Sequence, residues 1–182
     1  MVSVSRRPGQ GRYAHVEREQ RWIAASVPAD AVRTASILDR YIVGTRLRLR
    51  RVATPGETLL KLGQKVRIDV QDPEVVKLTN VYLSEQEYEV LAALPAAELS
   101  KTRWEIPWQG RTVAIDQFHG RLDGLVLAEV ELSPDDVHLE LPAFATRDVT
   151  NDDRFSGGAL ASATDASIAE LLRVATTVSD AD

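Results

Sequence analysis

The sequence contains no cysteine, and this absence removes several kinds of chemistry at once. Without thiols the chain has no disulfides, no thiolate nucleophile and no cysteine-ligated zinc site. It also lacks an apolar run of about 18 residues and a signal-peptide core near its N-terminus, so nothing predicts membrane insertion or secretion. We therefore expect no membrane partner, and we take the cytoplasm as the default location.

Positive charge is in deficit, with 22 Lys and Arg against 27 Asp and Glu and a formal net charge of -5. This balance argues against bulk nucleic-acid binding and against attraction to anionic membranes. The length of 182 residues and the 44% hydrophobic content fit one domain with its own core. We expect a flexible tail over 1–11 and a single domain over 12–182. A homodimer is left open.

Alternating polar and apolar residues dominate the chain and predict strands. The expected strands are 13–24, 37–43, 45–53, 57–69, 78–83, 99–107, 111–118 and 124–132, which suit a barrel or a large curved antiparallel sheet. Helices are fewer. A capping box at Ser84 predicts a helix over 85–94, and an apolar stripe predicts a C-terminal helix over about 165–178. Weaker signals predict a helical turn over 29–35, a short helix after Ser133-Pro134, and a bend at Gly157-Gly158.

The charged residues of these strands are sorted by sign. Arg46, Arg48 and Arg50 share one strand face, as do Lys61, Lys65 and Arg67, and Lys101 with Arg103. Glu129 and Glu131 share the face of a late strand, and the first strand carries Glu17, Glu19 and Arg21 at alternate positions. A single such face is most simply solvated surface. The sorting of sign by strand instead favours a polar lining with a cationic and an anionic part.

Such a lining has a chemical meaning. Guanidinium and ammonium groups suit phosphate oxygens, whereas carboxylates face phosphate favourably only through a divalent cation. Mg²⁺ and Mn²⁺ take oxygen ligands from one or two carboxylates and from the phosphates of a substrate. The pattern therefore suggests a site for a metal-bound polyphosphate. Asp116 either belongs to the metal region or ends a strand.

The same residues resemble a known family. Glu17-x-Glu19-x-Arg21 followed by Trp22-Ile23 is similar to the N-terminal Glu-x-Glu-x-Lys signature of the CYTH superfamily, the triphosphate tunnel metalloenzymes. Later blocks are similar to that family in its own order and together extend to about residue 161. They are Asp39–Ile42 with Thr45–Arg50, Lys61–Lys65, Leu99–Trp104, Ile115–Phe118, Leu127–Leu132 and Asp148–Thr150.

The resemblance implies an α+β, mainly β fold. It would be an eight-stranded antiparallel barrel, or tunnel, with a polar interior and a few helices packed outside. It implies Mg²⁺ or Mn²⁺ as cofactor, held by Glu17, Glu19, Glu129 and Glu131. The implied triphosphate-binding residues are Arg21, Arg46, Arg48, Lys61, Lys65, Lys101 and Arg103. The candidate catalytic residues are Glu17, Glu129 and Lys65, of which Glu17 or Glu129 would orient the attacking water.

The implied activity is metal-dependent hydrolysis of a small linear triphosphate, either inorganic or organic. Two alternatives stay open: an adenylate cyclase of the class IV type, and a non-catalytic module that binds polyphosphate or a nucleotide. Arg21 stands where the signature has lysine, and arginine keeps the charge but does not readily release a proton. The neutral strand Thr79–Leu83 lacks the further charged residues of many members, which argues against a second metal.

Overall fold

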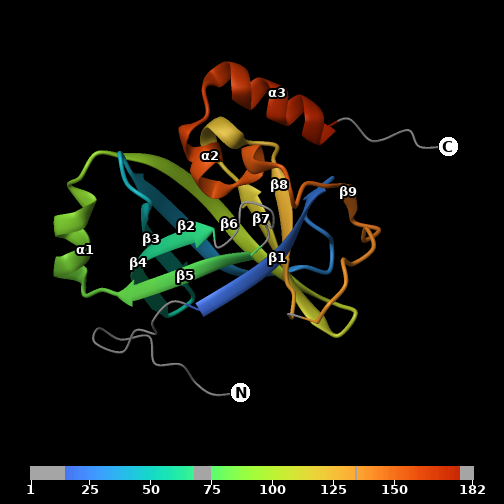
Figure 1. Ribbon diagram of the computed structural model, residues 1–182, viewed down its shortest axis with the longest axis horizontal. Helices are drawn as coiled ribbons and strands as arrows, with labels where there is room; N and C mark the ends of the chain where they lie inside the picture. Colours follow the sequence, from blue (N-terminus) through green and yellow to red (C-terminus); the bar gives the residue numbers. More distant parts are fainter. Residues whose placement is uncertain (1–14, 68–74, 134, 177–182) are drawn as a thin grey trace.

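The computed structural model describes residues 15–67, 75–133 and 135–176. Its strands β1 to β8 form a closed antiparallel barrel (Figure 1), which confirms the predicted fold class and the eight predicted strands. The strand bounds are β1 His15–Ala24, β2 Val32–Ile42, β3 Leu47–Thr54, β4 Glu57–Arg67, β5 Val75–Tyr82, β6 Ala96–Trp108, β7 Arg111–Phe118 and β8 Val126–Glu131.

Strand β1 closes the barrel. The sheet runs in the order β5-β4-β3-β2-β6-β7-β8-β1, and the first residues of β1 pair back onto β5, from His15 opposite Leu78 to Arg18 opposite Val75. The last residues of β1 pair instead with a short additional strand, β9 Ala145–Asp148. One edge of β1 is therefore shared between two partners, while its other edge follows β8.

The alternation of the strands separates a charged interior from an apolar exterior. Arg48 and Arg50 of β3 lie opposite Gly63 and Lys61 of β4, and cross-strand partners share a face, so these charged side chains point inward together. Leu49, between the two arginines, points outward and is fully buried beside Tyr88. That tyrosine belongs to α1 Glu85–Ala92, whose capping box is formed as predicted by Ser84 and Glu87.

The outer face of the other half of the barrel is covered by a loop. Trp22, Ile115 and Val130 pack there against Leu139 and Phe144, which lie between β8 and β9. The buried Gln20 fixes the loop, because its side-chain amide accepts a hydrogen bond from Leu139 N at 2.8 Å and donates one to Leu139 O at 3.0 Å.

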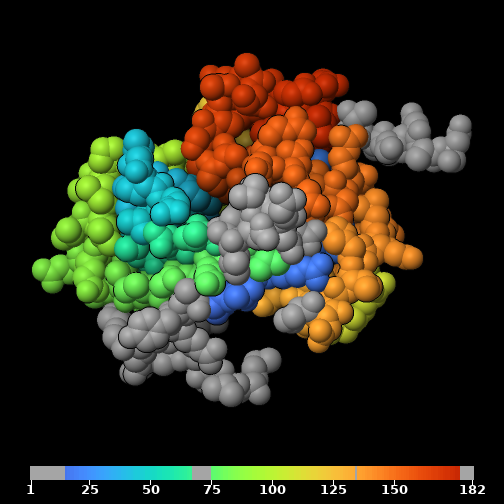
Figure 2. All heavy atoms as spheres, in the orientation of Figure 1, coloured from blue at the N-terminus to red at the C-terminus, as the bar shows by residue number. Residues whose placement is uncertain are grey.

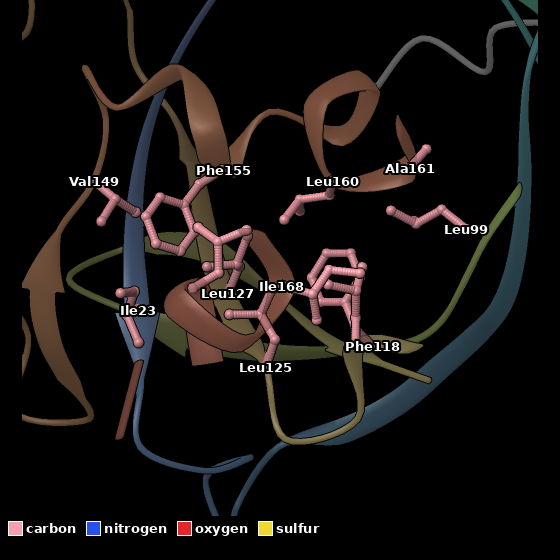
Figure 3. Close-up of a cluster of buried hydrophobic side chains, with 12 residues drawn as sticks. Ile23, Leu99, Phe118, Leu125, Leu127, Val149, Phe155, Leu160, Ala161 and Ile168 are labelled. Atoms are coloured by element: carbon pink, nitrogen blue, oxygen red, sulfur yellow. The ribbon is translucent and has the colours of Figure 1, made fainter. Parts of the chain in front are cut away.

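The C-terminal residues pack over one end of the barrel. Helices α2 Gly157–Ser162 and α3 Asp165–Thr176, with the 3₁₀ turns η1 Gly120–Leu122 and η2 Asp153–Phe155, gather in this region. Figure 2 shows α2 and α3, in orange and red, along one edge of the molecule, away from the green α1. Beneath them, Phe155 and Leu160 meet the side chains of Ile23, Phe118 and Leu127, which are inward-facing (Figure 3). No helix in the described ranges is both long and apolar enough to cross a membrane.

Three local predictions were wrong. Residues 32–35 belong to β2 and not to a helical turn. The described residues after Pro134 form no helix, because the Asp136 carboxylate accepts a hydrogen bond from Ser133 N at 2.6 Å and pairs with Arg111. Gly157-Gly158 begins α2 and is not a simple bend.

Gly157 is required by a close approach to β2. A Cβ atom at this position would lie 2.1 Å from the Tyr41 hydroxyl oxygen, so only glycine lets α2 start where it does. Strand β9 was not predicted. The C-terminal helix is described over Asp165–Thr176, and the end of its predicted range, like the predicted tail over 1–11, lies outside the described residues.

The end cluster yields a stability prediction. Leu160 is 1% exposed within it, so Leu160→Ala should lower the free energy of unfolding by about 2–5 kcal/mol through lost burial and a residual cavity. Val90→Ala, on a side chain of α1 that is 69% exposed, is the control and should change it by less than about 0.5 kcal/mol. Urea denaturation measures both, and equal values would show that α2 contributes little to the core.

Candidate active site

A cavity of about 510 Å³ lies inside the barrel and is lined mostly by charged side chains. Its wall therefore consists of the sign-sorted strand faces, as predicted from their alternation. The cationic lining residues are Arg21, Arg46, Arg48, Arg50, Lys61, Lys65 and Arg103. The anionic lining residues are Glu17, Glu19, Glu129, Asp152 and Asp153.

Asp39 of β2 holds two arginines of β3 in place. Its oxygens accept hydrogen bonds from Arg50 Nε at 2.5 Å and Arg50 Nη2 at 2.6 Å, and Arg48 Nε lies 3.7 Å away. Burial alone would raise the pKa of Asp39, but the Arg50 and Arg48 guanidinium groups outweigh it and lower that pKa to about 2. Asp39 is therefore ionised over the whole physiological range.

Asp116 of β7, two strands away from β2 in the barrel, has the same function. It accepts two hydrogen bonds from Arg103, each of 2.7 Å, and one from Lys101 Nζ. Lys101 is buried, and its burial lowers its pKa by more than Asp116 raises it. Because Lys101 does not line the cavity, the structure places this predicted phosphate ligand behind Asp116 and Arg103.

Glu129 of β8 lies between two guanidinium groups. Arg21 Nε donates to Glu129 Oε1 at 2.7 Å, and Arg103 Nη2 is 3.5 Å from Oε2. Burial raises the pKa of Glu129, but Arg21 and its cationic neighbours lower it well below its usual value. Arg21, at the lysine position of the signature, thus ties β1 to β8 through the cavity wall.

Glu17 and Glu19 of β1 enclose a lysine. Lys65 Nζ lies 3.1 Å from Glu17 Oε2 and 3.1 Å from Glu19 Oε2. Only the contact to Glu19 has hydrogen-bond geometry, so Glu17 Oε2 is a buried oxygen without a hydrogen-bond partner. Burial raises the pKa of Glu17, but Lys65 and then His15 lower it below its ordinary value.

Two cavity cations differ from the rest in having no carboxylate close by. In the part of the chain that the structure describes, neither Lys61 nor Arg46 has an acidic group within 4.0 Å. Burial, together with repulsion from Arg50 and Arg48, lowers the pKa of Lys61 to about 7. Lys61 and Arg46 are consequently available to an anion without breaking an existing ion pair.

Part of the cavity wall fits a divalent metal. Glu17 and Glu19 fit, because both line the cavity, both are carboxylates, and one buried oxygen of Glu17 lacks a hydrogen-bond partner. Glu129 lines the cavity but already binds two arginines, and Glu131 is exposed and outside the lining. Across residues 15–67, 75–133 and 135–176, no three acidic or histidine side chains are grouped to hold a metal. The fit is therefore to a metal held by two carboxylates plus ligand oxygens.

Sequence reasoning missed part of the site. It assigned no role to Asp39, left Arg50 out of the triphosphate-binding residues, and did not include Tyr41 or residues 152–158 of the cavity wall. The Asp39–Arg50 pair does have a signal, since the two residues are direct cross-strand partners in adjacent predicted strands. No sequence signal predicts that residues 152–158 reach the cavity wall, because their position depends on how the C-terminal residues fold back.

Comparison with known proteins finds a similar protein that matches part of the chain. No family model matches the chain. An inorganic triphosphatase of Acetivibrio thermocellus is 31% identical over 93 residues, covering 44% of this chain and 58% of that protein. The chain thus spans less than two thirds of the length of this curated relative.

Two crystal structures of protein NE1496 resemble the fold. One, described as a hypothetical protein, has a TM-score of 0.56 at 22% identity and covers 80% of this chain and 97% of that chain. The other, described as an inorganic triphosphatase, has a TM-score of 0.55 at 23% identity and covers 81% and 98%. At these identities the likeness shows the fold alone, and it is the fold that the predicted tunnel family requires.

The Asp39 ion pair yields a prediction. Asp39→Asn leaves Arg50 buried without its counter-charge and should lower the free energy of unfolding by about 3–5 kcal/mol. Asp165→Asn removes an exposed partner of Arg121 and should cost less than about 1 kcal/mol. Guanidinium denaturation at pH 7 measures both variants, and similar values would contradict the assigned role of Asp39.

The pH dependence of the stability difference between wild type and Asp39→Asn gives a second test of the Asp39 ion pair. The pKa of Asp39 lies near 2 when folded, against an unfolded value of 3.8, so its ionisation stabilises the fold above about pH 4. The advantage of wild type over Asp39→Asn should shrink as the pH falls from 4 toward 2.

Proposed function

We propose that this chain hydrolyses a small linear triphosphate, with inorganic triphosphate as the first candidate, in a reaction that depends on Mg²⁺ or Mn²⁺. One observation carries the proposal: among the described residues, the cavity combines two basic side chains with no acidic group within 4.0 Å, Lys61 and Arg46, with a carboxylate pair that fits a metal. The similarity to an inorganic triphosphatase over part of the chain supports it.

The residues of the chain would share the work of binding and positioning. Lys61, Arg46 and Arg48 bind phosphate oxygens, and Asp39 keeps Arg48 and Arg50 directed into the cavity. Arg21 and Arg103 present guanidinium groups held by Glu129 and Asp116. These groups are in place before the ligand arrives, so their orientation costs little when charge develops on the leaving diphosphate.

Glu17 and Glu19 would hold the metal together with ligand oxygens, and the metal when bound would neutralise phosphate charge and orient the terminal phosphoryl group. The lowered pKa values of Glu17 and Glu129 keep both carboxylates ionised. An ionised carboxylate accepts a hydrogen bond from water, so either residue can orient the nucleophile, and neither would act as an acid.

Adenylate cyclisation is less well supported. Apart from Tyr41, Val76 and Leu78, the cavity lining is polar, charged or glycine, and an adenine ring needs a larger apolar surface. A binding module without turnover is the remaining alternative, because Arg21 replaces the signature lysine. Phosphate release from triphosphate, cyclic AMP formation from ATP, and the melting temperature with triphosphate distinguish the three.

A charge-neutral substitution tests the metal site. Glu17→Gln combined with Glu19→Gln should lower Mg²⁺-dependent phosphate release by roughly 100-fold or more, because amides are weaker ligands for a hard cation. Glu85→Gln, exposed on α1, is the matched control and should retain full turnover. Full activity of the double variant would exclude this metal site.

Lys61 predicts proton uptake on binding. Its pKa of about 7 lies below the ordinary lysine value of 10.5, and a bound anion favours the ammonium form, so the protein should take up close to one proton at about pH 8. Calorimetry in two buffers of different ionisation enthalpy measures the proton uptake of wild type and of Lys61→Met. Subtracting one uptake from the other removes the contribution of protons bound or released by the ligand itself. Equal uptake by the two proteins would refute the role of Lys61.

A further inference from the structure

Lys65 differs from Lys61 in where its ammonium group lies. It is 3.1 Å from one oxygen of Glu17 and 3.1 Å from one oxygen of Glu19, the two carboxylates that fit a metal. Lys65 pairs with Leu78 of β5, and Val76 of β5 pairs with Glu17, so the side chain reaches β1 past two apolar residues. Because these β5 side chains offer no polar group, the two carboxylates determine where the ammonium group lies.

The Lys65 ammonium group does not satisfy the hydrogen-bonding capacity of both carboxylates. Arg21 Nη2 also lies 3.8 Å from Glu19 Oε2, but among the described residues no arginine pairs with Glu17. The buried Glu17 Oε2 is close to Lys65 Nζ without a hydrogen bond. The other oxygen of Glu17 is 2.9 Å from His15 Nε2. A divalent cation would match both carboxylate charges and would not need a directional hydrogen bond. An ammonium group and a metal ion cannot hold the same two oxygens at once.

An alternative position for the Lys65 ammonium group exists on its own strand. Gly63 lies between Lys61 and Lys65 on the inward face and carries no side chain. A Cβ atom there would be 3.1 Å from Asn80 Oδ1 and 3.7 Å from Arg48 Nη2, so any side chain would enter the space beside the arginine. A phosphate group over Gly63 would be within the reach of Arg48, Lys61 and a released Lys65.

We infer that the Lys65 ammonium group occupies the metal position in the free protein and is exchanged for the metal. The metal displaces this ammonium group, which then contacts the triphosphate. The inference rests on the proposed metal and triphosphate site. Lys65 then weakens the binding of metal alone and strengthens the binding of metal together with triphosphate. By linkage, each ligand raises the affinity for the other.

The first test measures metal binding without triphosphate. Mn²⁺ is titrated into metal-free wild type, Lys65→Met and Lys61→Met and followed by electron paramagnetic resonance. Lys65→Met should tighten Mn²⁺ binding by about tenfold, equivalent to about 1.4 kcal/mol. Lys61→Met makes the same substitution on the same strand face but breaks no ion pair, so it should tighten binding by less than about threefold. Equal shifts, or no tightening by Lys65→Met, would overturn the exchange.

The second test measures triphosphate binding by calorimetry, without and with Mg²⁺. Lys61→Met should weaken binding in both conditions, whereas Lys65→Met should weaken it mainly when Mg²⁺ is present. The factor by which Mg²⁺ tightens triphosphate binding should fall at least about fivefold in Lys65→Met. The exchange is wrong if Lys65→Met weakens binding equally with and without Mg²⁺.

Phosphate release measured on the same samples separates this inference from the proposed function. If the protein shows no turnover but the coupling between Mg²⁺ and triphosphate binding depends on Lys65, hydrolysis is refuted and the exchange is supported. Turnover with coupling unchanged by Lys65→Met would refute the exchange alone.

A measurement on the intact protein covers the case in which Lys65→Met does not fold. Wild type with ¹³C-labelled lysine side chains is titrated with Mg²⁺, and the Lys65 signal is assigned by its loss in Lys65→Arg. The Lys65 signal should shift as Mg²⁺ binds, ahead of any shift of the Lys61 signal. A Lys65 signal that stays unchanged at saturating Mg²⁺ would overturn the inference.

Discussion

The structure depends on the pairing of charges inside the barrel. Asp39 and Asp116 are buried carboxylates, and each holds at least one arginine by two hydrogen bonds. Without them Arg50 would be buried without a counter-charge, which is strongly unfavourable, and Arg103 would keep only its longer contact to Glu129. With them, a closed barrel can carry several inward cations and still leave a cavity. The stabilising pairs are therefore also what holds the arginines of the wall in position.

The remaining stability comes from apolar surfaces placed around this charged interior. Leu49 and Tyr88 pack outside one half, Trp22 and Val130 outside the other, and Phe155 and Leu160 over one end. The end cluster matters most for the cavity, because the same C-terminal residues contribute Asp152, Asp153 and Gly157 to the cavity wall. The site is therefore complete only when these C-terminal residues are packed on the barrel, and Gly157 lies against Tyr41 at this contact.

Sequence reasoning predicted what depends on local periodicity. Eight strands, the direction of most charged faces and the capped α1 follow from alternation and from Ser84 with Glu87, and each is present. It could not predict contacts made by distant segments, such as α2 against β2 or β9 against β1. It also treated inward charge as equivalent to ligand-binding charge. Lys101 shows the difference, since it points inward and yet is used up by Asp116.

The interior ion pairs are of two kinds, and the difference has a functional consequence. Asp39 and Asp116 are almost fully buried, so the arginines they hold are fixed in position whether or not a ligand is present. The pairs of Lys65 with Glu17 and Glu19 are more exposed and join a flexible lysine to carboxylates that a metal would also bind. An arginine fixed by a buried acid can orient a phosphate but cannot respond to a metal. A lysine between two half-buried acids can respond, so under the proposed function a response of this cavity to a divalent cation would come from β4 and β1, while the fixed arginines are held by β2 and β7.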